Sequence, residues 1–448
     1  MADVKILDIQ DNIDSHINWQ SLMDKEVELT GMVQNIRLPK WGAFIILRLA
    51  NYNIQTVVEN GKINIEPSTI PVEATIRVKG TVRPSQIKDL AICPRDIEIA
   101  VTNIEILSIP SLPALPLDTT KKDIEAGLDT KFNLRPLTLR HPKQRAIFKI
   151  SATIFNEFGN FLTKNGFTRI CSPKIVFSGA EGGANIFKLE YFDRNAYLAQ
   201  SPQFYKQMMV GAFGRVFETG PVFRAEKHDT SRHLNEYVSM DIEMALQNGY
   251  EELIQVETNA LKYIFDKVAS DCANEVALLG IEMPVIDKIY TFRFNDIKQI
   301  IFDKYGKDYR GEKDLCPEEE ALISKYVKDT YNSDLVFITH YPTIKRPFYA
   351  MPDPANPDET LSFDCLFRGL EITTGGERLY KYDDYVTNMK KRGMNVDLFQ
   401  SYLQTFQYGM PPHGGLGIGL ERVTAQLCGL SNVKEASLFP RDINRLEP

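Results

Sequence analysis

A proline-rich segment divides this 448-residue chain into two parts with different hydrophobic patterns. Residues 109–117 read IPSLPALPL, with a proline at every third position, and this spacing favours an extended, semi-rigid connector. A loop on the surface of one domain is the alternative, but the pattern changes after the segment, which favours a boundary. We therefore predict an N-terminal domain at 1–108, a linker at 109–134 and a C-terminal domain at 135–448.

The first part shows the alternation of short strands. Val27, Leu29 and Val33 alternate with polar neighbours, and β-rich runs follow at 43–49, 54–58, 75–82 and 96–106. Five short strands in so few residues suit a small barrel or sandwich, and our first choice is a five-stranded OB-fold barrel. Such barrels often bind single-stranded nucleic acid.

The second part mixes helical and strand patterns, so the whole chain is predicted to be a multidomain α+β protein. Apolar residues at helical spacing over 147–162 end at Gly166, and a second helix is expected over about 250–270. Residues 216–224 and 237–246 are predicted to form one hairpin. An antiparallel sheet flanked by helices accommodates these elements.

Composition excludes several classes of protein. With 52 Lys and Arg against 59 Asp and Glu, the chain is not a basic nucleic-acid coat protein, although a local basic face is sufficient for a nucleic-acid partner. The six cysteines are scattered and form no CxxC, so we expect neither disulfides nor zinc, and a reducing, cytoplasmic compartment. Without an apolar run of 18 residues or a signal-like N-terminus, no membrane segment is expected.

Two segments carry recognisable phosphate and ligand chemistry. Arg224 ends a strand, and the loop that returns to Tyr237 holds Arg232 and His233, which suits a phosphate because the arginine fork donates paired hydrogen bonds. Considered alone, the segment from Arg224 to Tyr237 is explained equally well as a solvated hairpin with ion pairs on its surface. The run GLGIGLER at 415–422 clears one strand face of side chains, which permits close approach of a ligand or a backbone. It matches neither a P-loop nor a Rossmann fingerprint, and a packed helix–strand joint is its alternative.

With NGFTRICSP at 165–173, these segments resemble motifs 1, 2 and 3 of class II aminoacyl-tRNA synthetases, in order and spacing. More narrowly, the chain resembles the compact archaeal and eukaryotic type of aspartyl-tRNA synthetase. The resemblance spans almost the whole chain and includes RPLTLRHP at 135–142, QSPQFYKQ at 200–207, RHLNE at 232–236, RGLEITTGGER at 368–378 and SLFPRD at 437–442.

The resemblance implies an ATP site. Arg224 is expected at the α-phosphate, with Arg232 and His233 at the outer phosphates. Tyr237 and Arg422 would sandwich the adenine, and Arg224 and Arg422 would be the catalytic residues. The ATP-binding set implied by the resemblance is Arg224, Glu226, Arg232, His233, Tyr237, Glu371, Gly419 and Arg422. Mg²⁺ would be held by Asp364, Glu371 and Thr374, since it prefers few carboxylates plus phosphate and water.

The resemblance also implies an aspartate site. Arg378 would hold the substrate side chain, and Lys206 would complete a cationic site that an amide would leave uncompensated. Gln203 and Glu181 would bind the α-amino group, and Thr374 belongs to the same set. His413 is a weaker candidate, since a lone histidine is equally well structural. An asparagine–tRNA ligase and a non-catalytic tRNA-binding paralogue are the rival readings; Lys206 argues against the first and the complete motifs against the second.

The expected partners are tRNA-Asp, with tRNA-Asn as a second candidate, and a second copy of the chain, because motif 1 builds a dimer interface in this class. For the anticodon, the resemblance points to Arg37, Phe44, Arg48 and Gln55 of the barrel. Three residues depart from the family pattern: Met32, Glu377 and Tyr380. Glu377 would add an acid beside the aspartate site.

Overall fold

The computed structural model describes residues 5–6, 17–63, 65–112, 115–177 and 185–448. The chain forms two compact units, Met1–Ala146 and Ile147–Pro448. The division falls inside helix α4 (Pro142–Lys164), so the segment predicted as a linker clusters with the N-terminal unit.

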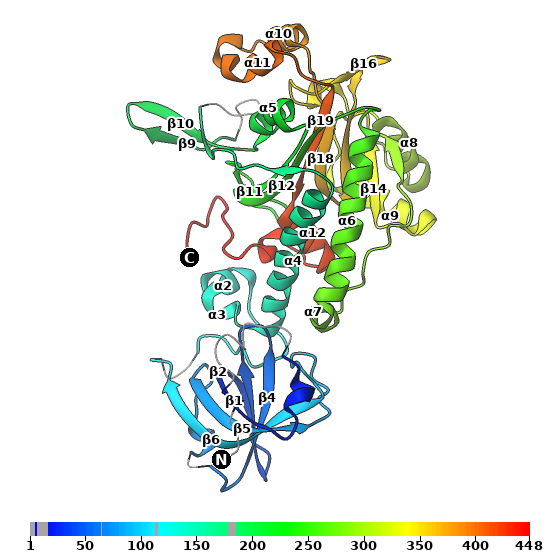
Figure 1. Cartoon of the computed structure of the whole chain (residues 1–448). Coiled ribbons are helices and arrows are strands. Elements are labelled where there is room, and N and C mark those ends of the chain that lie inside the picture. The colour runs from blue at the N-terminus through cyan, green and yellow to red at the C-terminus, as the bar shows by residue number, and fades with distance from the viewer. Residues whose placement is uncertain (1–4, 7–16, 64, 113–114, 178–184) are drawn as a thin grey trace. The chain divides into compact units, whose positions relative to one another are not determined.

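The smaller unit is a closed five-stranded barrel, as predicted. Its strands follow the order β2-β3-β4-β6-β5, and β5 pairs back onto β2 to close the barrel. Alternate residues such as Val27, Leu29 and Val33 point inward and are fully buried, which is the side-chain period of a strand. Figure 1 shows this barrel in blue and cyan. Its elements are β1 (Lys5–Ile6), η1 (Trp19–Leu22), β2 (Glu26–Arg37), β3 (Gly42–Arg48), β4 (Asn53–Glu59), η2 (Pro67–Thr69), β5 (Thr75–Pro84), β6 (Ile97–Ser108), α2 (Leu128–Asn133) and α3 (Arg135–Thr138).

The larger unit is built on an eight-stranded sheet in the order β13-β14-β17-β18-β19-β12-β11-β7. Its six central strands pair antiparallel, and only the two edge pairs, β13–β14 and β7–β11, are parallel. The strands are β7 (Thr168–Arg169), β11 (Arg215–Phe223), β12 (Glu236–Ala245), β13 (Thr291–Arg293), β14 (Leu335–Thr339), β17 (Ser362–Phe367), β18 (Leu370–Glu377) and β19 (His413–Gly419). Two small sheets accompany it: β8 (Ile175–Val176), β9 (Lys188–Tyr191) and β10 (Arg194–Leu198), and β15 (Pro352–Asp353) with β16 (Asn356–Thr360).

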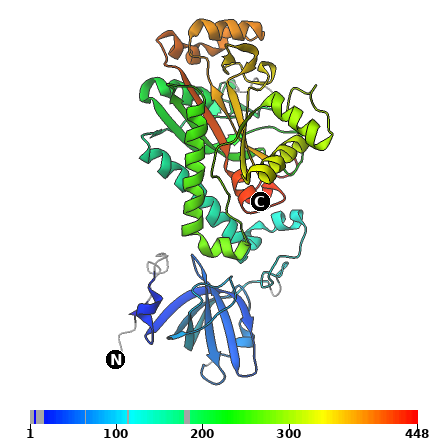
Figure 2. The ribbon, with the colours of Figure 1, turned by 90° about the vertical axis from the view of Figure 1, so that its right-hand side faces the viewer.

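Helices cover this sheet in separate groups. The helices are α5 (Gln203–Phe213), α6 (Glu251–Asp271), α7 (Ala273–Leu279), α8 (Phe294–Tyr305), α9 (Pro317–Tyr331), η3 (Thr343–Lys345), α10 (Tyr382–Lys391), η4 (Val396–Phe399), α11 (Gln400–Gln407), α12 (Leu420–Leu427) and η5 (Val433–Ala436), in addition to α4. Apolar residues of α4, α6 and α12 share one core with the sheet. Helices α8 and α9 pack on the β14 side, and α10 and α11 join α5 in an aromatic cluster. Figures 1 and 2 show α10 and α11 together at one end of the unit. Within the described residues, no helix is long and apolar enough to span a membrane.

The local predictions for this unit are confirmed. The helix predicted from the apolar spacing is α4, and it gives way to Gly166 at a φ of 79°. The predicted hairpin is β11–β12, and the predicted helix at 250–270 is α6. The glycine-rich run forms β19 followed by α12.

Strand β12 has two chemically different faces, and this decides where a polar site can form. Met240, Ile242 and Met244 enter the core under α4 and α6. Ser239, Asp241 and Glu243 alternate with them and therefore occupy the opposite face, where they are buried but polar. Buried carboxylates require partners, so this face has to be a charged site or an ion-paired layer.

The glycines of β19 make room for that polar face. A Cβ on Gly415 would lie 2.0 Å from Oε2 of Glu243 and 2.2 Å from the carbonyl oxygen of Ile242. Both distances are impossible for real atoms, so only glycine fits opposite Glu243. The glycine-rich strand therefore allows Glu243 and the backbone of β12 to approach it closely, as the glycine spacing predicted.

One buried acid supports the sheet from its helical side. Glu257 of α6 is fully buried and accepts a hydrogen bond of 2.5 Å from Oγ1 of Thr373. Burial raises the pKa of this carboxyl to about 8, which favours its neutral form in the folded protein. Thr373 directly precedes Thr374, so this contact helps to define the position of strand β18.

Glu257 should make folding stability depend on pH. Between the unfolded pKa near ~4.3 and the folded pKa, the native chain holds a proton that the unfolded chain has released, so stability falls as pH rises through this window. We expect Glu257→Gln to flatten the fall in unfolding free energy between pH 5 and 8 by on the order of a few kcal/mol. Denaturant titrations measure this, with Asp266→Asn, an exposed acid of the same helix, as the control. Parallel pH profiles of Glu257→Gln and the parent would contradict the assignment.

Candidate active site

A cavity of about 1080 Å³ lies over the polar face of the sheet. Within the described part of the chain, it collects every residue that the sequence predicted for ATP, aspartate and metal. These lining residues are Gln203, Lys206, Arg224, Glu226, Arg232, His233, Tyr237, Asp364, Glu371, Thr374, Arg378, Gly419 and Arg422. Glu181 lies outside the described residues. The family motifs, far apart in sequence, therefore meet in one place.

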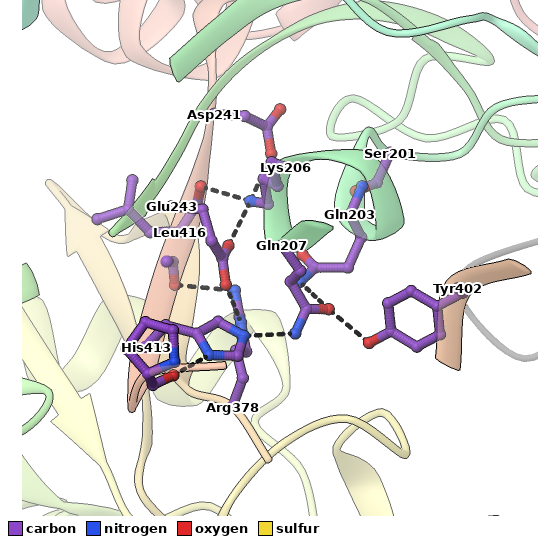
Figure 3. Close-up of polar contacts among 12 residues, drawn as sticks. Ser201, Gln203, Lys206, Gln207, Asp241, Glu243, Arg378, Tyr402, His413 and Leu416 are labelled. Atoms are coloured by element: carbon purple, nitrogen blue, oxygen red, sulfur yellow. Dashed lines mark hydrogen bonds and ion pairs between the residues drawn. The ribbon is translucent and has the colours of Figure 1, made fainter. Parts of the chain in front are cut away.

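The cavity contains a buried cluster of alternating charges (Figure 3). Lys206 comes from α5, is only 2% exposed and places Nζ 2.8 Å from Oδ1 of Asp241 and 3.5 Å from Oε2 of Glu243. The same ammonium donates to the carbonyl oxygen of Leu416 at 2.9 Å. Two hydrogen-bond acceptors and a second carboxylate at ion-pair distance therefore fix the lysine within the cavity wall.

Arg378 completes the cluster. Its Nε donates to Oε1 of Glu243 at 3.0 Å and its Nη2 to the carbonyl oxygen of Gly415 at 2.9 Å. Asp241 lines the cavity with Lys206 and Arg378, whereas Glu243 is not among the lining residues. Lys206 and Arg378 contribute two positive charges and Asp241 and Glu243 two negative charges, so the cluster is balanced, with both cations in the cavity wall.

The structure corrects one step of the sequence argument. We expected an amide substrate to leave Lys206 without a compensating charge, but Asp241 and Glu243 already pair with it. The sequence argument missed both acids. Their signal was the alternation of Ser239, Asp241 and Glu243 with Met240, Ile242 and Met244, which marks a strand with one polar, buried face.

The carboxylates predicted for Mg²⁺ lie on adjacent strands. Asp364 of β17 pairs with Thr374 of β18, and an irregularity in the ladder lets Leu366 face Glu371 while Ile372 is the extra residue. Such a bulge re-aims side chains. As a result Thr374 donates its Oγ1 hydrogen to Oε1 of Glu371 at 3.1 Å, although the residues are three apart on a strand.

These residues suit a magnesium ion bound together with phosphates. Among the described residues no cluster of three or more His, Cys, Asp or Glu side chains could hold a metal alone. Two carboxylates with a hydroxyl form a partial donor set, which Mg²⁺ completes with phosphate and water. Burial and the neighbouring Glu371 raise the pKa of Asp364 to about 6 against the opposing effect of Arg346, so a cation at this position would be favourable.

The outer part of the cavity is lined by Arg224, Arg232 and His233, which belong to the segment that resembles motif 2. Arg224 follows β11, and its guanidinium lies 5.8 Å from the ring centroid of Tyr237. Arg232 pairs with Glu320 at the start of α9, and Glu320 also accepts from the backbone N–H of Glu371 at 2.9 Å. His233 places Nδ1 2.6 Å from Oγ1 of Thr230, and burial lowers its pKa.

Arg422 opens helix α12 and reaches the metal-ligand candidates. Its Nη1 donates to the carbonyl oxygen of Glu371 at 2.7 Å and lies 3.4 Å from Oε1 of the same residue. Beside it, both carboxylate oxygens of Glu421 accept from the backbone N–H of Val238 at 3.1 Å. This contact ties α12 to β12 and so fixes Arg422 relative to Tyr237.

Two residues that the sequence suggested for the site, Glu377 and His413, have structural roles instead. Glu377 accepts a hydrogen bond of 2.9 Å from the backbone N–H of Tyr250 at the start of α6 and does not line the cavity, so it is not an added acid at the aspartate site. His413 is buried, with Nδ1 2.9 Å from the carbonyl oxygen of Pro411 and Nε2 3.0 Å from the Gln207 amide. The Tyr402 hydroxyl extends this network by donating to the side-chain oxygen of Gln207 at 2.9 Å (Figure 3).

The four barrel residues predicted for the anticodon divide into two pairs. Arg48 is buried in an ion pair with Glu73, and Gln55 is buried with its amide 2.9 Å from Oε2 of Glu98. Phe44 is half-buried and Arg37 is exposed, paired with Asp89 at 2.8 Å. Beside Phe44, Trp41 is 49% exposed and meets its ring edge-to-face at 5.1 Å. The sequence argument missed this tryptophan.

Known proteins resemble this chain over nearly its full length. A family model described as tRNA synthetases class II (D, K and N) matches residues 127–443. The aspartate–tRNA(Asp/Asn) ligase of Thermus thermophilus is 40% identical over 425 residues, which are 95% of this chain and 97% of that protein. The aspartate–tRNA(Asp) ligase of Pyrococcus abyssi is 37% identical over 435 residues, covering 96% and 98%.

Solved structures agree with this match. A putative aspartyl-tRNA synthetase from Leishmania major Friedlin superposes with a TM-score of 0.85 at 29% identity, covering 100% of this chain and 95% of that chain. The asparaginyl-tRNA synthetase of Pyrococcus horikoshii in complex with asparaginyl-adenylate superposes at 0.86 with 27% identity, covering 96% and 97%. Together with the motif residues gathered around one cavity, these matches show that the chain belongs to the class II aminoacyl-tRNA synthetases of the D, K and N group.

Proposed function

We propose that the protein is an aspartate–tRNA ligase, which activates L-aspartate with ATP and transfers it to the 3′ end of tRNA-Asp. The observation that carries this proposal is the position of Lys206 and Arg378 in the wall of one cavity, where an ammonium and a guanidinium are available to a substrate carboxylate. Asp241 and Glu243 already balance the two cations, so the choice of aspartate over asparagine rests on the relatives rather than on the charge of the cluster. The first-named relatives, all aspartate–tRNA ligases, support the same choice.

The first reaction step needs no general base. The ionised α-carboxylate of aspartate attacks the α-phosphorus of ATP, the bond to the bridging oxygen breaks, and pyrophosphate leaves with that oxygen. Catalysis then consists of positioning and charge neutralisation. Arg224 is assigned to the α-phosphate, where negative charge increases in the transition state.

The other lining residues bind and orient the substrates. We assign Arg232 and His233 to the outer phosphates, Tyr237 and Arg422 to the two faces of adenine, and Glu226 to its edge or to the motif 2 loop. Gly419 leaves space beside the nucleotide. Gln203, with Glu181 and Thr374, is assigned to the aspartate backbone. When bound, Mg²⁺ would neutralise the triphosphate, held by Asp364, Glu371 and Thr374.

In the second step a hydroxyl of the 3′-terminal ribose of the tRNA attacks the carbonyl carbon of the aspartyl-adenylate formed in the first step, the bond to the phosphate oxygen breaks, and AMP leaves. We propose the barrel as the anticodon-binding part, with Phe44 and Arg37 at its surface, and Arg48 and Gln55 as supports beneath that surface. A homodimer in the cytoplasm is the proposed working form. Exposed apolar side chains beside motif 1, Ile175 and Phe177, support a partner surface there.

ATP–pyrophosphate exchange tests the activation step without tRNA. We expect exchange with aspartate and little with asparagine. Arg224→Ala should lower the aspartate-dependent rate by about 100- to 1000-fold, because it removes a donor to the developing charge. Arg310→Ala, an exposed arginine outside the cavity, serves as the control. Preference for asparagine would overturn the substrate, and no exchange with either amino acid would favour a non-catalytic paralogue.

Lys206→Met tests the charge argument. We expect kcat/KM for aspartate to fall about 100-fold or more, since a buried cation is removed while its acidic partners stay. Lys174→Met is the matched control, because Lys174 also pairs with a buried acid, Glu218, at 2.6 Å, but outside the cavity. An equal loss in both variants would mean that Lys206 acts only through folding.

The tRNA choice has its own test. Relatives named for tRNA(Asp/Asn) and for tRNA(Asp) match this chain about equally well, so tRNA-Asn is a second candidate acceptor. Aminoacylation with aspartate should charge purified tRNA-Asp. Charging of tRNA-Asn at a comparable rate would establish relaxed choice, and no charging of tRNA-Asn would restrict the enzyme to tRNA-Asp.

A further inference from the structure

We propose that Arg346 is a resident counter-cation of the magnesium site: it neutralises Asp364 while no divalent cation is bound and turns to an anionic oxygen of the nucleotide when the cation arrives. This inference rests on the proposed function, because it takes Asp364 as a metal ligand. Sequence reasoning did not identify Arg346, which lies on the loop that follows η3.

The contact between the two side chains is short and buried. Nη2 of Arg346 lies 2.8 Å from Oδ1 of Asp364, and the side chains are 11% and 7% exposed. Both residues line the cavity, as does Glu371. The guanidinium therefore occupies the immediate surroundings of the proposed metal ligands, and a cation that binds Asp364 has to compete with it.

The contact is also poorly aligned, which makes it exchangeable. Nη2 of Arg346 and Oδ1 of Asp364 lie 2.8 Å apart without hydrogen-bond alignment, and Nε of Arg346, which is also buried, has no hydrogen-bond partner within the described residues. Buried donors and acceptors without partners are costly, so both side chains gain from a better partner. Asp364 would find one in a divalent cation, and the arginine fork would find one in a phosphate.

The backbone around Arg346 is fixed, so the exchange needs only a side-chain movement. Arg392, at the end of α10, donates from Nη1 to the carbonyl oxygen of Arg346 at 2.8 Å and from Nη2 to that of Thr343 at 3.1 Å. The guanidinium carbon of Arg346 lies 3.8 Å from the ring centroid of Tyr341. The ring gives the cation a defined resting position in contact with Asp364.

The proposal is tested by titrating the full chain with Mn²⁺ in the absence of nucleotide. The paramagnetic resonance signal of free Mn²⁺ measures how much of the ion is bound. Asp364→Asn should weaken binding strongly, which identifies the site. Arg346→Met should bind Mn²⁺ about tenfold more tightly than the parent, because the competing cation is gone. The matched control is Lys345→Met, which removes a neighbouring positive charge that pairs with Asp314, 3.6 Å away, rather than Asp364.

The outcomes separate this inference from the proposed function. If Asp364→Asn leaves Mn²⁺ binding unchanged, the metal assignment is wrong and the inference falls with it, while pyrophosphate exchange still tests the ligase activity. If Asp364→Asn weakens binding but Arg346→Met does not tighten it, only the role of Arg346 is overturned. If Lys345→Met raises the affinity for Mn²⁺ as much as Arg346→Met does, the effect comes from the loss of any nearby positive charge. That result would also overturn the role of Arg346.

Two further measurements keep the test usable if Arg346→Met fails to fold. Arg392→Met leaves Arg346 in place but frees its loop, and should tighten Mn²⁺ binding in the same direction by a smaller factor. A non-hydrolysable ATP analogue should bind about tenfold more weakly to Arg346→Lys than to the parent, since a lysine cannot donate the paired bonds. Unchanged Mn²⁺ binding in Arg392→Met together with unchanged analogue binding in Arg346→Lys would contradict the exchange.

Discussion

The buried charge cluster on strand β12 is the interaction on which the site depends. Asp241 and Glu243 lie on the polar face of a strand whose other face is core, and both side chains are almost completely buried. Lys206 from α5 and Arg378 after β18 pair with them, and thereby tie a helix and three strands together. A glycine at position 415 is the condition for this arrangement, because any Cβ there would overlap Glu243.

The same pairing of opposite charges recurs around the cavity. Lys206 with Asp241, Arg346 with Asp364, Arg232 with Glu320 and Arg422 with Glu371 each place a cation against an acid beside the space assigned to the substrates. Such pairs keep the cations ordered before substrates bind and limit the electrostatic repulsion among them. Anionic substrates then meet donors that are already in position, and reorganisation is small. These pairs differ in how easily they exchange partners. Lys206 donates to two aligned acceptors, whereas the Arg346–Asp364 pair is not aligned and Nε of Arg346 is buried without a hydrogen-bond partner within the described residues.

Much of the fold and the site could be predicted from the sequence. Period-two alternation identified the barrel strands, and helical spacing with a stop at Gly166 identified α4, because these patterns follow from local backbone geometry. Residues that line the cavity could be named in advance where they belong to a motif, as for Arg224, Lys206 and Arg422. Asp241, Glu320 and Arg346 were not found, because their significance lies in contacts with residues far away in the chain: the Lys206–Asp241 pair spans 35 residues and the Arg232–Glu320 pair spans 88.

The sequence alone determined the succession of elements, the fold class and the family, since these depend on local periodicity and on motifs that can be read in order. Only the tertiary structure decided which charges neutralise one another. It assigned Glu377 to the start of α6, His413 to a buried network and Arg48 to the barrel interior, and it put Arg346 on Asp364. The physical reason is that the electrostatic role of a side chain depends on burial and on the nearest opposite charge, and both are properties of distance in space rather than of position in the chain.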